Sequence, residues 1–384
     1  MNPTSPLPVA DAWRIAFVTE TYPPEVNGVA MTVGNLVRGL RQRGVQVTVF
    51  RPRQGAGDVG EADCHVLPGY PLPGYPDVRW GLPAGRALRR HWQHLRPHVV
   101  HVVTEGPLGW SAVNAARALG IPVTSGFHTN FDSYSVHYGL GWLRPMVAAY
   151  LRTLHRRTRR TMVPTASLAA ELASDGLAGV RVVGRGVDTA AFSPRYRDLA
   201  LRQCYGVEGE GPLCLYVGRL APEKNLALAC RTFAAIQVWH PGARMLWVGD
   251  GPARPALAAA HPDHSFAGQR TGEDLAAHYA SADLFLFPSL TETYGNVVAE
   301  AMASGLPVLA YRSAAAAELI DAQRNGALVE PGDEQAFVEA ALCLLEDGAR
   351  RQKIAAAACL TMQQHRWDAV IERFVHVVSE ALAD

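Results

Sequence analysis

Short apolar runs alternate with helical patterns along the whole chain of 384 residues, and this alternation constrains the fold more than any other feature. The runs are too apolar to alternate between a core face and a solvent face, which is typical of strands covered by helices on both sides. Alternating strands and helices predict parallel sheets with right-handed crossovers. The runs expected to be strands are 14–19, 45–50, 99–104, 121–128, 212–218, 243–249, 282–289 and 306–311.

The predicted strand–helix units are too many for one compact sheet, so we expect an α/β protein with two Rossmann-like, doubly wound parallel-sheet domains. A stretch rich in glycine, proline and charge, 182–198, is the expected linker; an ordinary surface loop is the alternative. The predicted domains are residues 1–190 and 191–365. Residues 366–384 form an amphipathic helix that could pack back on the N-terminal domain. Ligands of such sheets bind beyond the carboxyl ends of strands, so we expect the domains to face a central cleft.

Composition excludes several classes of protein. A formal net charge of +1 argues against nucleic-acid binding through bulk charge. The six cysteines are scattered without CxxC pairs or zinc spacing, which is typical of a reducing compartment. No signal-peptide pattern and no apolar stretch of about 18 residues is seen, so we expect a soluble, cytoplasmic protein.

The stretch SLTETYGNVVAEAMASGLPVLA contains two carboxylates, Glu292 and Glu300. We expect Glu292 in a loop after a strand, and a helix that begins near Gly295 and carries Glu300 in its first turns. The carboxylates can accept hydrogen bonds from sugar and ribose hydroxyls. The N–H groups of Gly295, Asn296 and Val297 can bind a diphosphate. The alternative is two solvated glutamates near a helix start.

The stretch YVGRLAPEKN places two cations, Arg219 and Lys224, directly after a predicted strand. Two cations there can neutralise a diphosphate, and Gly218 lets the backbone approach it. The chain has 36 basic residues, of which only Lys224 and Lys353 are lysines. The alternative is a charged loop with an internal Arg219–Glu223 pair.

A third junction of strand and helix lies near the N-terminus. The stretch GVAMTVGNLVRGLRQRG begins at Gly28 and follows the predicted strand RIAFVT. Its apolar residues have helical spacing, and Gly44 stands where a helix would end. A glycine at such a junction is typical of a site that faces an anion.

Taken together, VGRLAPEKN and ETYGNVVAE resemble the GT-B glycosyltransferases of the retaining family 4 type. FVTETYPPEVNGVAMTVGNLVRGL, HVVTEGPLG, GFHTNFDSY, RGVD and VGDGP follow in the expected order, so the resemblance covers nearly the whole chain. The first three segments are most similar to the bacterial branch that contains sulfoquinovosyl-, mannosyl- and glucosyl-lipid transferases.

For the C-terminal domain the resemblance implies that Arg219 and Lys224 hold the leaving diphosphate and that Glu300 binds the ribose hydroxyls. Glu292 would contact the donor sugar, helped by backbone amides after Tyr294, where the family often has Phe. The expected donor-binding residues of this domain are Gly218, Arg219, Lys224, Glu292, Tyr294, Gly295, Asn296, Val297 and Glu300.

For the acceptor-side N-terminal domain it implies that Gly28 and Val29 form a loop beneath the diphosphate or the transferred sugar. His128 would lie beside that sugar; a satisfied core or capping histidine is the alternative. Glu105 and Asp132 are expected on the acceptor side, and Asp132 could instead cap a helix. The expected catalytic residues are His128, Arg219, Lys224 and Glu292.

No Asp-x-Asp pair follows a predicted strand, so neither a metal nor another cofactor is expected. Charge that develops on the diphosphate would be stabilised by cations and a helix terminus. The resemblance implies that the anomeric configuration is kept. The departing phosphate would take the acceptor's proton after front-face attack.

The resemblance implies transfer of a hexose to a membrane lipid such as diacylglycerol, with a UDP-hexose favoured as donor. Base recognition would use backbone groups around Gly268–Arg270. A polysaccharide, lipopolysaccharide or soluble acceptor is the main alternative, and a nucleotide-sugar-binding protein without activity is a remote one. An oxidoreductase is disfavoured because VGDGPARP has Arg254 where a GxGxxG loop has its third glycine.

An arginine-rich segment, 151–160, is expected on a helix. With the apolar and aromatic residues before it, this segment could contact an anionic membrane from the cytoplasmic side. The alternative is a solvated basic helix face.

Overall fold

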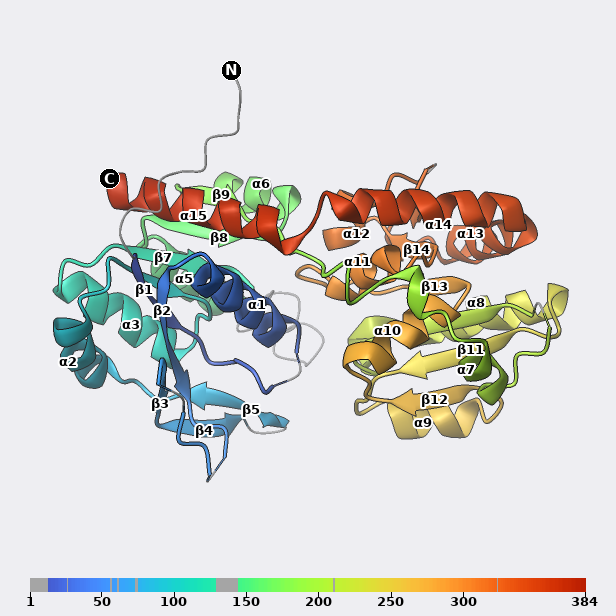
Figure 1. Ribbon diagram of the computed structural model, residues 1–384, viewed down its shortest axis with the longest axis horizontal. Coiled ribbons are helices and arrows are strands. Elements are labelled where there is room, and N and C mark those ends of the chain that lie inside the picture. The colour runs from blue at the N-terminus through green and yellow to red at the C-terminus, as the bar shows by residue number, and fades with distance from the viewer. Residues whose placement is uncertain are drawn as a thin grey trace, which may run out of the picture. The chain divides into compact units, whose positions relative to one another are not determined.

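The structure is a computed structural model that describes residues 13–25, 27–55, 57–60, 62–72, 75–128, 144–209, 211–322 and 324–384. The chain forms two compact units (Figure 1). Unit 1 comprises Met1–Arg185 and Trp367–Asp384, and unit 2 comprises Gly186–Arg366. The unit boundaries therefore fall at residues 185/186 and 366/367, where the sequence predicts 190/191 and 365/366.

Unit 1 contains a seven-stranded sheet in the order β3-β2-β1-β6-β7-β8-β9, with every described pairing parallel. A separate antiparallel hairpin is formed by β4 and β5. The sequence predicts β1, β2, β6 and β7 but none of the other strands. The strands are β1 (Arg14–Val18), β2 (Gln46–Pro52), β3 (Cys64–Leu67), β4 (Gly69–Leu72), β5 (Tyr75–Gly81), β6 (Val99–Val102), β7 (Val123–Gly126), β8 (Arg160–Val163) and β9 (Val180–Val182).

Helices cover both faces of this sheet, and α15 (red in Figure 1) is the last of them. Although unit 2 precedes it in the chain, α15 packs beside α1 and β8. Its Ile371 and Phe374 are buried in the same core as Phe17 and Val33. The helices of unit 1 are α1 (Gly28–Gln42), α2 (Gly85–Leu95), α3 (Pro107–Ala118), α5 (Arg144–His155), α6 (Ala166–Ser174) and α15 (Trp367–Ala383).

The prediction of a helix over 151–160 is wrong at its C-terminal end. Helix α5 ends at His155, whose carbonyl accepts a hydrogen bond from the Thr158 hydroxyl at 2.8 Å. Arg160 is already in β8, paired with Thr124 of β7. Pairing of β8 within the sheet therefore overrides the helical pattern of the segment. None of the helices in the described part of the chain combines the length and the apolar character that spanning a bilayer requires.

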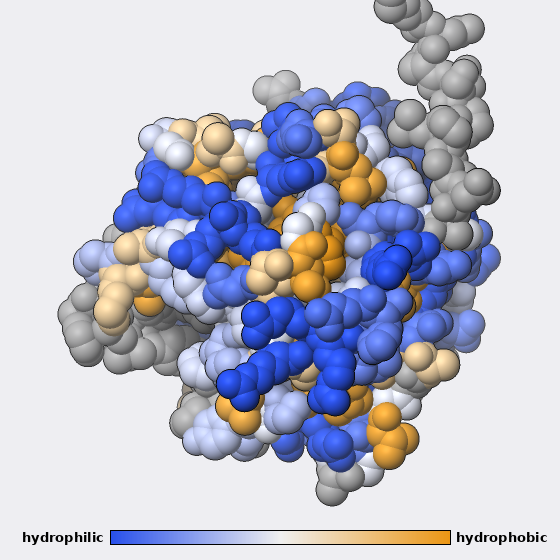
Figure 2. Space-filling view, turned by 90° about the vertical axis from the view of Figure 1, so that its left-hand side faces the viewer, coloured by the Kyte–Doolittle hydropathy of each residue, from blue (hydrophilic) through white to orange (hydrophobic). Residues whose placement is uncertain are grey.

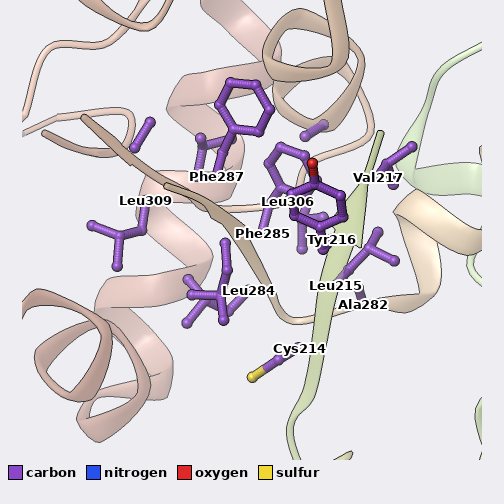
Figure 3. Packing of buried hydrophobic residues seen from close by; sticks show 14 of the residues in the cluster. Cys214, Leu215, Tyr216, Val217, Ala282, Leu284, Phe285, Phe287, Leu306 and Leu309 are labelled. Carbon is purple, nitrogen blue, oxygen red and sulfur yellow. The ribbon is translucent and has the colours of Figure 1, made fainter. Parts of the chain in front are cut away.

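Unit 2 contains a six-stranded parallel sheet in the order β12-β11-β10-β13-β14-β15. Its core is one continuous cluster, in which Tyr216, Phe285 and Leu306 pack together (Figure 3). The strands are β10 (Leu213–Val217), β11 (Arg244–Val248), β12 (Ser265–Gly268), β13 (Leu284–Phe287), β14 (Val308–Tyr311) and β15 (Ala327–Val329). The helices are η2 (Pro194–Tyr196), α7 (Leu199–Cys204), η3 (Pro222–Lys224), α8 (Leu226–Trp239), α9 (Arg254–Ala260), α10 (Gly272–Ser281), α11 (Asn296–Ala303), α12 (Ala314–Leu319), α13 (Glu334–Glu346) and α14 (Gly348–Gln363).

Both units are Rossmann-like, as predicted, and each sheet has a switch point at which the strand order reverses. In unit 1 it lies between β1 and β6, and in unit 2 between β10 and β13. Loops that leave the carboxyl ends of two such strands diverge to opposite faces of the sheet and leave a crevice between them. The charged residues singled out in the sequence follow these strands.

Candidate active site

The loop after β10 is held close to the loop after β11 by backbone contacts. Gly218 donates a hydrogen bond to Val248, and Leu220 donates one to Asp250. A Cβ at Gly249, where φ is +127°, would overlap the carbonyl of Gly218. Glycine is therefore required at position 249 for this approach, which places Arg219 at the carboxyl edge of the sheet.

Lys224 links the loops that leave β10 and β13, the two strands of the switch point. Its Nζ lies 2.5 Å from Oε1 of Glu292, and the residue is buried. The Thr291 hydroxyl donates to the carbonyl of Glu223 at 3.2 Å and joins the same two loops. Arg219 lies 3.5 Å from Glu223, so the internal pair that the sequence offered as an alternative also forms. The structure thus brings Arg219, Lys224 and Glu292 into one network.

Helix α11 begins at Asn296, where the sequence predicts a helix start. Gly295 caps it in the left-handed conformation (φ +88°) and, as a glycine, offers no side chain to the N–H groups of this end. The N-terminus of α11 therefore lies four residues after Glu292, at the same edge of the sheet. Tyr294, which stands where the family often has Phe, is buried in the core beneath it. An anion at this end would interact favourably with the helix dipole.

Glu300 lies one turn into α11 and is partly buried. Its Oε2 accepts a hydrogen bond from the Tyr279 hydroxyl at 2.9 Å. Burial raises the pKa of Glu300 from 4.5 to about 7, and the Tyr279 hydrogen bond opposes part of that rise. A carboxyl group with this pKa changes charge in the physiological range, so it can meet a ligand hydroxyl in either protonation state.

Tyr216 lies beneath this network. Its hydroxyl donates to the carbonyl of Arg219 at 3.2 Å. Burial is the main cause of its strongly raised pKa, and the charges of Glu292 and Glu223 add to it. Tyr216 in turn acts on the pKa of Tyr279. The electrostatic interactions of Tyr216 therefore link Glu292 to the hydrogen-bonded pair of Tyr279 and Glu300 through the core of unit 2.

The Gly28 junction of unit 1 has a feature that sequence reasoning missed. Asn27 caps α1, and its Oδ1 accepts hydrogen bonds from Val29 at 3.1 Å and Ala30 at 2.8 Å. Its amide group also donates to the Thr21 hydroxyl at 2.7 Å. The N–H of Val29 already has an acceptor, so an anion at this helix end would compete with Asn27. An asparagine one residue before a predicted helix was the available signal.

Two buried carboxylates follow the switch-point strands of unit 1. Glu105, which the sequence singled out, follows β6, and Glu20, which it missed, follows β1. Glu20 accepts a hydrogen bond from the Leu108 N–H at 3.2 Å. Burial, with a smaller contribution from Glu105, raises the pKa of Glu20 to about 7. A Cβ at Gly106 would overlap the Glu20 carboxylate, so glycine permits this close approach.

Glu105 has no hydrogen-bond partner for either carboxylate oxygen in the described part of the chain. The nearest basic atom is Nε2 of His155, at 3.6 Å. His155 is itself anchored through Nδ1 to the Ser125 hydroxyl at 2.9 Å. Buried polar atoms are nearly always satisfied, so this pair is suited to bind a further hydroxyl or water.

His128 follows β7, as predicted, and its Nδ1 is buried without a partner among the described residues. Burial lowers the pKa of His128 well below 6.5, and the positive charge of Arg185 lowers it further. Its buried position therefore favours the neutral imidazole. Asp132, the remaining acceptor-side residue of the sequence analysis, lies outside the described residues.

One group in the described part of the chain has potential metal ligands within 4.8 Å of one another: Cys230, His261 and His264. Cys230 lies on α8, and the two histidines lie between α9 and β12. The Trp247 indole donates to Nδ1 of His264 at 3.1 Å, so the neutral imidazole carries its proton on Nε2. Burial also raises the pKa of Cys230 to about 11. Nδ1 of His264 already accepts a hydrogen bond and the Cys230 thiol is protonated at neutral pH, so both groups would have to change before they could bind a metal.

Comparison with known proteins identifies the family. Residues 26–191 match the family described as Glycosyltransferase Family 4, and residues 211–347 match the one described as Glycosyl transferases group 1. A GDP-mannose-dependent alpha-mannosyltransferase of Mycobacterium tuberculosis is 33% identical, over 94% of this chain and 95% of the relative. The chain belongs to glycosyltransferase family 4.

Other relatives are named for the transfer of different sugars. The sulfoquinovosyl transferase of Arabidopsis thaliana is 31% identical, over 93% of this chain and 71% of the relative. The alpha-monoglucosyldiacylglycerol synthase of Streptococcus pneumoniae is 27% identical, over 82% of this chain and 75% of the relative. The chain is thus a glycosyltransferase, as the motifs predict.

Solved structures agree on the GT-B fold. Sucrose-phosphate synthase from Thermosynechococcus elongatus aligns with a TM-score of 0.81 at 19% identity, over 97% of this chain and 99% of that one. HepE of Anabaena, in complex with UDP and glucose, aligns with a TM-score of 0.75 at 19% identity, over 96% of this chain and 100% of that one. The prediction of a GT-B fold is confirmed.

Proposed function

We propose that this glycosyltransferase moves a hexose from a nucleotide-diphosphate sugar to a membrane lipid and keeps the anomeric configuration. The observation that carries the proposal is the network at the switch point of unit 2. There Arg219 and Lys224 lie with Glu292 beside the N-terminus of α11, and Glu300 lies one turn further on. Cations beside a helix N-terminus suit a diphosphate, and carboxylates suit hydroxyls.

Leaving-group stabilisation would be the main catalytic effect. As the bond between the sugar C1 and the phosphate oxygen breaks, negative charge builds on the diphosphate. Lys224 and Arg219 would stabilise that charge together with the N–H groups of α11. Lys224 binds Glu292 in this structure, so the diphosphate would have to share the ammonium group with that carboxylate. The acceptor hydroxyl would attack from the same face and give its proton to the departing phosphate.

For the donor we favour GDP-mannose over the UDP-hexose that the sequence analysis favours. Three relatives that are 31–33% identical over more than nine-tenths of this chain are named GDP-mannose-dependent alpha-mannosyltransferases. The neighbours in complex with UDP are below 20% identity and support only the fold.

For the acceptor the support comes from the relatives named alpha-monoglucosyldiacylglycerol synthase. The arginine-rich segment adds none, because four of its arginines, Arg152, Arg157, Arg159 and Arg160, already bind groups of unit 1. Arg157 donates to Asn114, and Arg160 pairs with Glu380 and Asp384. Figure 2 shows one face of unit 1, on which hydrophilic side chains cover most of the described surface and apolar ones form separate small patches.

The test is a matrix of donors and acceptors. The purified chain is incubated with GDP-mannose, UDP-glucose or UDP-galactose and with diacylglycerol in mixed micelles, a soluble oligosaccharide or no acceptor. The proposal predicts release of GDP that depends on diacylglycerol, and an α-linked mannolipid as product. Transfer to the oligosaccharide and not to diacylglycerol would show that the acceptor is a glycan. A β-linked product would contradict retention of the anomeric configuration.

A further inference from the structure

Tyr279 of α10 is a fully buried tyrosine whose hydroxyl is directed at Glu300. The ring is packed edge-on against Phe192, with centroids 5.7 Å apart, and Phe285, with centroids 5.9 Å apart. These contacts hold the ring in one position, so the hydroxyl cannot follow a moving partner. It donates to Oε2 of Glu300 at 2.9 Å.

Glu300 depends on this hydrogen bond for its orientation. In the described part of the chain no side chain other than Tyr279 binds its carboxylate, and Oε1 has no partner. A glutamate has three rotatable side-chain bonds, and fixing one of its oxygens leaves the other aimed in one direction. Oε1 is therefore the atom offered to a ligand.

We propose that Tyr279 is a positioning residue for the donor: it holds Glu300 so that Oε1 accepts a hydrogen bond from a ribose hydroxyl of the nucleotide sugar. The inference rests on the proposed function, because it assumes that a nucleotide binds at this site. It adds a residue from a different helix, 21 positions before Glu300, that would act on the ligand through Glu300.

A hydroxyl at this position is not needed for packing. Tyr311 of β14 is a buried tyrosine in the same core, and its hydroxyl makes no side-chain hydrogen bond in the described part of the chain, where the backbone of Gly332 is its neighbouring donor. The core of unit 2 thus accepts a tyrosine ring whose hydroxyl binds no side chain. Phenylalanine would fill either ring position equally well. Tyr311→Phe is therefore a matched control for Tyr279→Phe.

The experiment measures binding of GDP and UDP, and of their 2′,3′-dideoxy forms, by titration calorimetry. The parent should bind the ribonucleotide about thirtyfold more tightly than the dideoxy form, as for one hydrogen bond to a charged group. Tyr279→Phe should lose most of that difference, because its affinity should fall for the ribonucleotide and not for the dideoxy form. Tyr311→Phe should bind both forms like the parent.

Turnover separates positioning from general damage. Tyr279→Phe should raise KM for the nucleotide sugar about tenfold while kcat stays within about twofold, because the hydroxyl acts on the ribose and not on the breaking bond. A double variant that combines Tyr279→Phe with Glu300→Gln should bind the nucleotide sugar as tightly as Glu300→Gln alone, since Tyr279 acts through Glu300.

Three results would overturn the inference. Tyr279→Phe could discriminate between ribo and dideoxy nucleotides as well as the parent does, or it could lose affinity equally for both forms. The losses of affinity in Tyr279→Phe and Glu300→Gln could also add in the double variant. If Tyr279→Phe does not fold, Glu300→Gln must still abolish the discrimination between ribo and dideoxy forms, or the inference is wrong. A parent chain that binds neither GDP nor UDP would instead overturn the proposed function.

Discussion

Units 1 and 2 have carboxylates at equivalent points of similar sheets, but the two sets differ in their hydrogen-bond and ion-pair partners. In unit 2, Glu292 and Glu300 belong to the loop and helix after β13, and each has a partner, Lys224 or Tyr279. In unit 1, Glu105 follows β6 and has no hydrogen bond to either oxygen in the described part of the chain. Both sites are at switch points, where open α/β sheets bind ligands.

The difference shows how far each half is preorganised. Ion pairs and hydrogen bonds hold the proposed donor-binding groups of unit 2 in place in this structure. In the described part of unit 1, the carboxylate oxygens of Glu105, Nδ1 of His128 and Nε2 of His155 have no hydrogen-bond partner, at a cost that a bound hydroxyl would offset. We infer that the donor half is set by the protein itself, whereas the acceptor half is completed by its ligand.

Lys224→Ala should have the largest effect. It removes a cation that would stabilise the leaving diphosphate and leaves Glu292 without its partner, so kcat should fall on the order of 10²–10³-fold. Stopped assays of nucleotide release measure this fall. The exposed Lys353, the chain's other lysine, is the control, and Lys353→Ala should turn over like the parent. Equal activity of both variants would break the assignment of unit 2 as the donor half.

Ile371→Ala tests the units as separate folding bodies. Ile371 of α15 is buried in unit 1, so its truncation should destabilise unit 1 by about 2–5 kcal/mol. Thermal unfolding should show a lower transition for unit 1 and an unchanged one for unit 2. Leu360→Ala, at an exposed position of α14, should change stability by less than about 0.5 kcal/mol. A shift of unit 2 alone would contradict the packing of α15.

Glu300→Gln should weaken nucleotide binding about thirtyfold at pH 8. Parental affinity should fall as pH drops through 7, because the pKa of Glu300 is raised to about 7 and the ionised form is the stronger acceptor. The raised pKa also means that the folded parent is destabilised as pH rises from about 4.5 to 7. The variant should therefore be the more stable chain above pH 7 and equally stable near pH 4. A flat affinity profile in the parent would contradict this role of Glu300.

Glu105→Gln should have the smallest effect and act on the other half. We expect the KM for the acceptor to rise about tenfold, because a neutral amide accepts a hydroxyl hydrogen bond less strongly than a carboxylate. The Kd for GDP should not change. Glu171→Gln, at an exposed position of α6, is the control. Loss of nucleotide affinity in Glu105→Gln would break the division of labour between the units.

Much of the fold could be predicted because the signals are local. Each predicted strand is a continuous apolar run, and the start of α11 is marked by Gly295 within a few residues. The strands that were missed, such as β8 and β9, have four and three residues, and pairing within the sheet stabilises them more than their own composition does. The same pairing ends α5 at His155.

Site residues that belong to a sequence motif could be predicted. Site residues that meet only because the chain folds could not. Arg219, Lys224, Glu292 and Glu300 stand in two recognisable stretches. Tyr279 and Glu20 do not, because their partners are 21 and 88 positions away. Only folding shows which tyrosine hydroxyl reaches Glu300.

Hydrogen exchange with and without saturating GDP shows whether unit 2 binds the nucleotide, because it reports which backbone segments a nucleotide covers. We expect the strongest protection in residues 216–225 and 289–300 of unit 2, with smaller changes in the loops after β11 and β12. Protection confined to unit 1, or binding that leaves both of these segments unchanged, would contradict that expectation.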